Sequence, residues 1–223
     1  MSMFNMSVAQ GVKEGGKFLQ AGIHNATFMG IDKTEINGKN GDTFNVLVMK
    51  FDVEGFGEIE HKLFEPTSNT RTESQFGGQN PSQLEQFMIA NRHLLDTANP
   101  DIAKGIDDGT VTIDAPNFAS FVKKMQEFTN DFIGKSVKIK LLPTKSGFNQ
   151  MPSFPAKISK AGKLYLTTSF IGNELTLTAN ELAAIEKAKN AKPTNMAERK
   201  SGDDILEGMD ADINSTENDD LPF

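Results

Sequence analysis

Alternation of apolar and polar residues dominates the first third of the chain and predicts three consecutive strands. The candidates are residues 23–33, 43–53 and 58–64, and they are separated by Asn-Gly and Gly-bearing turn signals. The second candidate carries apolar residues on both of its faces. A strand of that kind is expected in the middle of a sheet, where both faces are covered.

Helical spacing replaces alternation in the middle of the chain. After a polar stretch expected to be a loop, Asn80-Pro81 predicts a helix start, with Asn as the cap and Pro as the first helical residue. A second helix is expected after Pro116, with a stripe of phenylalanines, and Gly134 is expected to end it. Phenylalanines at helical spacing usually belong to a core, so this stripe is interpreted as packing.

Alternation returns after Gly134. A hairpin is predicted about Ala161-Gly162, and Asn180 can cap a last helix that runs to about residue 190. The strands expected in this part are residues 137–141, 156–160, 163–170 and 172–178.

The order of these elements predicts a mainly β fold with inserted helices, of the α+β class. A five-stranded barrel of the oligonucleotide-binding (OB) type fits it, with two helices between the third and fourth strands. Residues 1–20 are expected to be an irregular lead-in, and residues 21–190 the OB-like domain. Residues 191–223 are expected to be a flexible linker and an acidic tail.

Composition removes several classes of function. The 223 residues contain no Cys, which excludes disulfides, cysteine nucleophiles and thiolate metal sites. No signal peptide and no apolar run of membrane-spanning length is visible, so no membrane partner is expected. A cytoplasmic location is therefore predicted, which would be the host cytoplasm if the protein is phage-encoded.

The net charge of −7 is unevenly placed. The segment 201–223 holds eight acids and no Lys or Arg, so it repels itself and is expected to be disordered. The rest of the chain is nearly balanced, with 23 Lys and Arg residues against 22 acids. Overall acidity therefore says little about what the folded part binds.

The acidic segment ends with two acids followed by three apolar residues, Asp219-Asp220-Leu221-Pro222-Phe223. This tip resembles the C-terminal tip of bacterial and bacteriophage single-stranded-DNA-binding proteins, in which Ile is usual where Leu221 stands. The resemblance implies a phage-type protein that coats single-stranded DNA during replication, recombination and repair. It also implies that these five residues recruit replication proteins, with the ring in a pocket and the carboxylates near Arg or Lys.

Lysines and rings gather between residues 135 and 170, where seven lysines occur and no acid. Lysines can neutralise phosphates while rings stack on bases, so this region is the predicted DNA-binding surface. Lys138 and Lys140 are expected on one exposed strand face, and Lys163 and Tyr165 on one face of the hairpin. The early Asn-Gly turn is a second candidate, at the place of a nucleic-acid-contacting OB loop. The candidates are Lys138, Lys140, Lys145, Phe148, Phe154, Lys157, Lys163 and Tyr165, together with Lys33 and Lys39 near the early turn.

Other interpretations stay open. The lysines could be a solvated sheet face, with Phe148 and Phe154 folded back on the core. The whole chain could be an acidic-tailed protein that binds other proteins, or a nuclease that uses its Asp group. The sequence carries no complete motif of an enzyme, a metal site or a cofactor site, so no catalysis, metal or cofactor is expected. An oligomer is possible.

Overall fold

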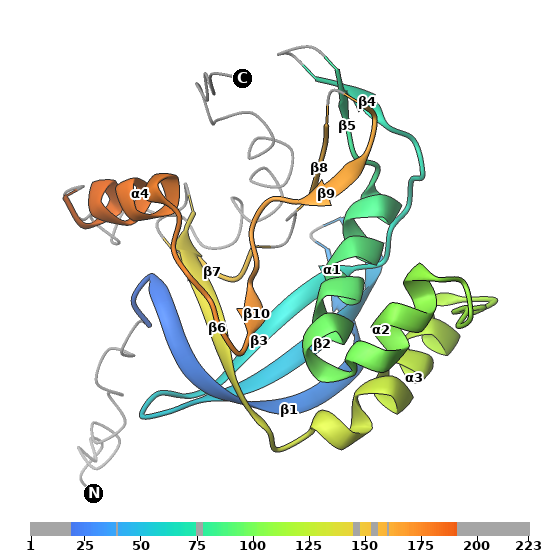
Figure 1. Cartoon of the computed structure of the whole chain (residues 1–223), viewed down its shortest axis with the longest axis horizontal. Coiled ribbons are helices and arrows are strands. Elements are labelled where there is room, and N and C mark those ends of the chain that lie inside the picture. Colours follow the sequence, from blue (N-terminus) through green and yellow to red (C-terminus); the bar gives the residue numbers. More distant parts are fainter. Residues whose placement is uncertain are drawn as a thin grey trace, which may run out of the picture.

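A curled antiparallel sheet forms the centre of the molecule in this computed structural model, which describes residues 19–38, 40–74, 78–144, 148–152, 156–159 and 161–190. The order of its main strands is β10-β6-β1-β2-β3, and β7 pairs with the other end of β6 (Figure 1). The strands of this sheet are β1 (Gly22–Asn37), β2 (Thr43–Val53), β3 (Gly57–Phe64), β6 (Ser136–Pro143), β7 (Asn149–Gln150) and β10 (Ile171–Gly172). The predictions for the lead-in and the acidic tail concern residues almost entirely outside these described ranges.

The first three strands and β6 form a Greek key. β1, β2 and β3 follow one another as hairpins, and β6 returns after a long connection to pair with the other side of β1. The prediction that β2 is central is confirmed, because Val46, Leu47, Val48 and Met49 are all at most 2% exposed. The mixed α+β class is confirmed as well. Of the strand expected at residues 172–178, only Gly172 lies in a strand, the two-residue β10.

Four helices accompany the sheet in the described part of the chain. Helices α1, α2 and α3 gather on one side of it, and α4 lies apart from them (Figure 1). None of these helices combines the length and the apolar character needed to cross a bilayer. Their bounds are Gln83–Ala98 for α1, Pro100–Asp107 for α2, Phe118–Thr129 for α3 and Ala179–Asn190 for α4.

The predicted start of the first helix was wrong by two residues. Asn80 belongs to a small hairpin, β4 (Thr72–Glu73) with β5 (Gln79–Asn80), inside the expected loop. The cap is Ser82, whose Oγ accepts from the N–H of Glu85 at 3.1 Å. The Glu85 carboxylate in turn accepts from the Ser82 N–H at 2.9 Å. Asn80 instead pairs with Thr72 in the small hairpin, and the Gln83 side chain accepts from the Thr67 N–H at 3.0 Å.

The predicted count of two inserted helices was also wrong, because α2 is a third. It begins with the Asn-Pro motif expected earlier: the Asn99 side chain accepts from the Ile102 N–H at 3.3 Å, and Pro100 is the first helical residue. An Asn-Pro pair does start a helix in this protein, but at Asn99-Pro100 and not at Asn80-Pro81.

The phenylalanine stripe of α3 packs in the core, as predicted. Phe118 and Phe121 are 8% exposed, and their rings lie 5.8 Å and 5.2 Å from the ring of Phe87 on α1. Helix α3 is followed by a short 3-10 helix (Asn130–Phe132) and then by Gly134, which has a φ of +80°. They lead the chain directly into β6.

Aromatic rings join the two ends of the curled sheet. The His61 ring on β3 lies 5.2 Å from the Phe170 ring, which immediately precedes β10, and the His93 ring on α1 lies 4.9 Å from the same phenyl group. No backbone pairing connects β3 with β10 among the described residues. Burial lowers the pKa of His61 to about 4, so its ring is neutral at neutral pH.

Candidate nucleic-acid interface

A second small hairpin carries the best-placed lysines and ring. It consists of β8 (Ala156–Ile158) and β9 (Leu164–Leu166), with Lys157 directly opposite Tyr165. Gly162 has a φ of +76°, a value that glycine adopts readily, and the Gly162 N–H bonds the Ser159 carbonyl at 2.8 Å. The predicted hairpin about Ala161-Gly162 is confirmed, although its strands are shorter than expected.

The two faces of this hairpin differ as predicted. Ala156 is buried and both leucines of β9 are half-buried, so one face packs against the domain. Lys157, Lys163 and Tyr165 are exposed, with 46% of the tyrosine accessible. Cross-strand neighbours lie about 5 Å apart at Cβ, so the Lys157 amine and the Tyr165 ring share one outer surface.

A glutamine on α1 holds the hairpin against the domain. The Gln86 amide donates to the Ala156 carbonyl and accepts from the Ala156 N–H, both at 2.9 Å. The first turn of α1 is held nearby by an ion pair, in which Arg71 donates to the Glu85 carboxylate at 2.9 Å. That bond and the bond from Ser82 lower the pKa of Glu85 to about 2. Sequence reasoning missed Gln86, because nothing local relates two residues 70 positions apart.

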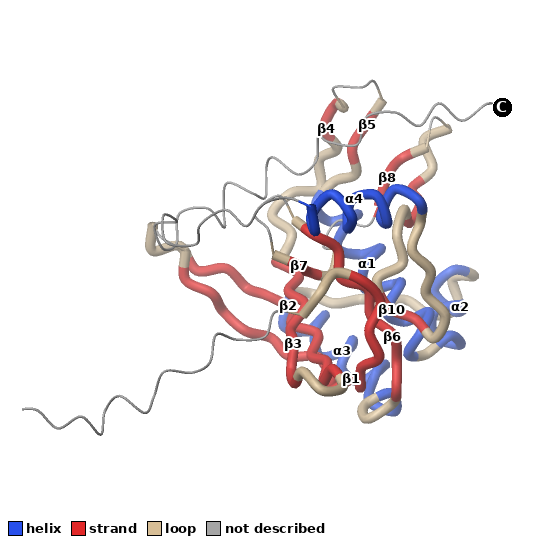
Figure 2. Tube along the Cα trace, turned by 90° about the vertical axis from the view of Figure 1, so that its left-hand side faces the viewer, coloured by secondary structure: helices blue, strands red, loops and turns tan. Residues whose placement is uncertain are grey.

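The β4–β5 hairpin was also missed, and it lies beside this surface. Residues of β5 contact β8, and both hairpins stand above the central sheet in Figure 2. The pair Gly77-Gly78 is a turn signal that could have indicated a hairpin here.

Phe148 lies on a different hairpin, the one formed by β6 and β7. The Phe148 carbonyl accepts from the Thr144 N–H at 2.8 Å, next to the pairing of β6 with β7. Asn149 donates to the Leu19 carbonyl at 2.9 Å and ties β7 to the start of the described chain. Phe148 is 47% exposed, so it does not fold back to cap the core.

Lys140 corrects the prediction that both β6 lysines lie on an exposed face. Lys138 is half-buried, but Lys140 is only 2% exposed because α4 covers it. Its ammonium lies 2.9 Å and 3.0 Å from the two carboxylate oxygens of Glu181, on α4. Thr168 also donates to that carboxylate, at 2.5 Å. Lys140 is therefore part of an internal ion pair and not of the outer surface.

Glu181 is held in its charged form. Burial alone would raise its pKa, but the hydrogen bonds from the Thr168 hydroxyl, the Thr178 N–H and the Lys140 ammonium together lower it. The Thr178 hydroxyl accepts from the Glu181 N–H at 3.2 Å. This second capping box starts α4, so Thr178 is the cap that was expected at Asn180.

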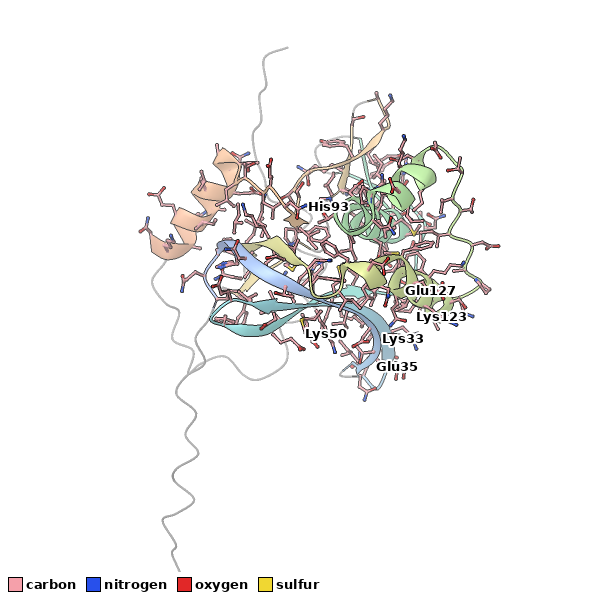
Figure 3. All side chains as sticks on the ribbon, turned by 60° about the horizontal axis from the view of Figure 1, so that its bottom comes forward. Lys33, Glu35, Lys50, His93, Lys123 and Glu127 are labelled. Carbon is pink, nitrogen blue, oxygen red and sulfur yellow. The ribbon has the colours of Figure 1, made fainter. Side chains whose placement is uncertain are left out.

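Lys33 lies on β1 and not in the early turn. Its ammonium is 3.2 Å from the Glu35 carboxylate, two residues along the same strand. In Figure 3 both side chains stand on the part of β1 that reaches away from the body of the domain. The remaining candidates lie outside the described residues, namely Lys39, Lys145, Phe154, Asp219, Asp220, Leu221, Pro222 and Phe223.

Two acids at the end of α2, Asp107 and Asp108, have protein partners. Asp107 accepts from Arg92 at 2.6 Å, and Asp108 accepts from the Thr110 hydroxyl at 2.6 Å and from the Thr110 N–H at 3.0 Å. Each bond lowers the pKa of the carboxyl group that accepts it. Within the ranges that the structure describes, no three His, Asp or Glu side chains gather as metal ligands would.

Comparison with known proteins does not assign the chain to a group, since no protein-family model matches it and no curated protein sequence matches it.

Proposed function

We propose that this protein binds single-stranded DNA with little preference for base sequence, through the outer face of the β8–β9 hairpin. The observation that carries the proposal is the exposed cross-strand pair Lys157–Tyr165, with Lys163 at the adjoining turn. An ammonium group can neutralise a phosphate while the neighbouring ring stacks on a base. Stacking of this kind stabilises binding by about 1–3 kcal/mol per base and is available to every base.

The local charge supports binding to a polyanion. No acid occurs from Lys135 to Phe170, so the hairpin face has no carboxylate of its own segment to repel a phosphate. Since Lys140 is used internally by Glu181, the available cations of the described segment are Lys135, Lys138, Lys157 and Lys163.

The position of the hairpin in the fold supports an OB-like interpretation. The Greek-key order of β6, β1, β2 and β3 is the arrangement of a partly open OB barrel. The β8–β9 hairpin and Phe148 both belong to the connection from β6 to β10. In OB folds the connection between the fourth and fifth strands is a place of nucleic-acid contact.

The C-terminal tip enters this proposal through its resemblance alone. We infer that Asp219 to Phe223 recruit replication proteins to the DNA-bound domain, and that the protein itself performs no catalysis. The acidic segment is also expected to compete with DNA for the lysines at low salt, because eight negative charges are attached to the same chain.

The test is a titration of the full chain against oligo-dT and against duplex DNA of the same length, at two salt concentrations. We expect the single strand to bind more tightly and the affinity to fall steeply with salt. Phe148→Ala and Tyr165→Ala should each weaken binding without lowering the melting temperature. Equal affinity for duplex and single strand would overturn the proposal, and no binding to either would favour a protein-binding function.

A further inference from the structure

The passage from β1 to β2 contains two Asn-Gly pairs in succession, Asn37-Gly38 and Asn40-Gly41. Figure 2 shows the β1–β2 hairpin reaching out from the sheet. In an Asn-Gly pair the asparagine side chain is readily attacked by the main-chain nitrogen that follows it, because glycine has no side chain to obstruct the approach. Since the dipeptide is the same in both pairs, the surrounding structure decides which of them reacts.

The first pair is held by the end of the strand pairing. Asn37 is the last residue of β1 and lies opposite Thr43, whose hydroxyl donates to the Asn37 Oδ1 at 3.3 Å. The nitrogen that would attack Asn37 belongs to Gly38, and its N–H donates to the Asp42 carbonyl at 2.7 Å. The main chain of Gly38 also packs against the Phe44 ring, because a Cβ at this position would lie 2.8 Å from the Phe44 Cε2. Both reacting groups of this pair are therefore fixed in place.

The second pair has far fewer restraints. Asn40 is exposed and lies outside the strands, and no hydrogen bond joins its side chain to any residue that the structure describes. Gly41 has a φ of +83°, and a Cβ at this position would meet no atom within 4 Å. The Gly41 N–H does donate to the Gly38 carbonyl, but at 3.2 Å this bond is longer than the one made by the Gly38 N–H. Ring closure at Asn40 thus breaks one hydrogen bond, whereas ring closure at Asn37 breaks two and disturbs the strand pairing.

We propose that Asn40 is a site of spontaneous deamidation and that the fold protects Asn37. The Gly41 nitrogen attacks the Asn40 Cγ, and the new C–N bond closes a five-membered succinimide ring. The bond from Cγ to Nδ2 breaks, and ammonia leaves with the proton that the Gly41 nitrogen has lost. Water then opens the ring at either of its carbonyl groups, which gives aspartate or isoaspartate. No other reactant is required, and the proposal is independent of nucleic-acid binding.

The reaction changes the charge and the geometry of the turn. Either product carries a new carboxylate close in sequence to Asp42, and isoaspartate also adds a carbon atom to the main chain. Pairing of β1 with β2 begins at Asn37 and Thr43, outside the modified pair, so the domain should stay folded. A folded, more acidic form of the protein should therefore accumulate as a sample ages.

The experiment is peptide mapping of the full chain after incubation at mildly alkaline pH. Trypsin cleaves after Lys33, Lys39 and Lys50, so the two pairs fall in separate peptides, residues 34–39 and 40–50. Digestion is kept brief and mildly acidic to prevent further reaction. In the folded chain, deamidation of peptide 40–50 should be about tenfold or more faster than that of peptide 34–39, equal to about 1.4 kcal/mol or more. In urea the two peptides should react at similar rates, because the protection of Asn37 is lost.

Two matched variants assign the acidic form by ion-exchange chromatography. Asn40→Gln should remove the fast phase of its accumulation, because a glutamine side chain closes the corresponding larger ring slowly. Asn37→Gln changes the other pair in the same way and should leave the fast phase at the wild-type rate. Equal rates for the two peptides in the folded chain overturn the proposal, and so does the same inequality in urea, which would assign the difference to local sequence. Loss of the fast phase in Asn37→Gln, with its retention in Asn40→Gln, overturns it as well.

Discussion

Two lysines, each between two apolar residues of a strand, end in opposite environments. Lys140 stands between Ile139 and Leu141 on β6, and Lys157 stands between Ala156 and Ile158 on β8. The first is 2% exposed and bound to a carboxylate of α4, whereas the second is exposed opposite a tyrosine. Alternation assigns a side chain to one face of a strand. Whether that face meets water depends on an element that can lie 40 residues further along the chain.

The largest expected effect is on stability, at the buried lysine. Lys140→Met should lower the free energy of unfolding by about 2–4 kcal/mol, because the Glu181 carboxylate is left without its cation. The range is set somewhat below the 3–5 kcal/mol typical of a fully buried pair, since the Glu181 side chain keeps 11% of its surface exposed. Urea denaturation measures this difference.

A second change at the same site separates charge from packing. Lys140→Met with Glu181→Gln removes the uncompensated charge and keeps a side chain that can serve the capping box of α4. It should recover most of the lost stability. If the double variant is as unstable as Lys140→Met alone, the loss comes from packing and not from the carboxylate.

His61 provides the next effect, as a buried titratable group without a charged partner. Its Nε2 has no hydrogen-bond partner in the described part of the chain, and its pKa in the folded protein is about 4 against 6.5 for the ordinary group. The unfolded chain therefore binds more protons between these values, so stability is full above pH 6.5 and falls as the pH drops toward 4. The loss at pH 4.5 should be about 2–3 kcal/mol.

The measurement is urea denaturation at a series of pH values for the wild type and for His61→Leu. The leucine variant should show a clearly smaller loss of stability between pH 6.5 and 4.5. His93 keeps a contribution of the same sign, because burial lowers its pKa as well. Parallel curves for the two proteins would show that His61 does not cause the acid sensitivity.

The sequence predicted those parts of the fold that depend on local signals. Strand β2 agrees with its expected bounds, because turn signals stand at both ends, and helix α4 begins two residues before its expected start and ends at the expected residue. Signals that occur more than once were assigned less well, as Asn80-Pro81 and Asn99-Pro100 show. Of the candidate site, the hairpin face was predicted from the alternation of Lys163, Leu164, Tyr165 and Leu166. The cover over Lys140 and the anchor at Gln86 come from tertiary contacts, which no local pattern encodes.

Tyr165 should have the largest effect on DNA binding without an effect on stability. Tyr165→Ala removes one stacking platform, which corresponds to roughly a fivefold to hundredfold loss of affinity for oligo-dT. Tyr165→Phe keeps the ring and should bind nearly as well as the wild type. Fluorescence anisotropy gives the affinities and thermal melting gives the control. If the alanine variant binds as well as the wild type, the hairpin face does not contact the bases.

The smallest effect distinguishes Lys157 from Lys140 in DNA binding. It is expected in the salt dependence of the affinity more than in the affinity itself. A lysine that neutralises one phosphate of a single strand contributes about 0.7 to the slope of log affinity against log salt. Lys157→Ala should therefore reduce the magnitude of the slope by about 0.7, equally for all base sequences, and Lys157→Arg should keep it. The double variant Lys140→Met with Glu181→Gln should leave the slope unchanged, since the Lys140 ammonium of the wild type faces a carboxylate inside the protein. A lower slope in the Lys140 variant, with no change on removal of Lys157, would mean that α4 moves away on binding and that the covered face of β6 is the one that meets DNA.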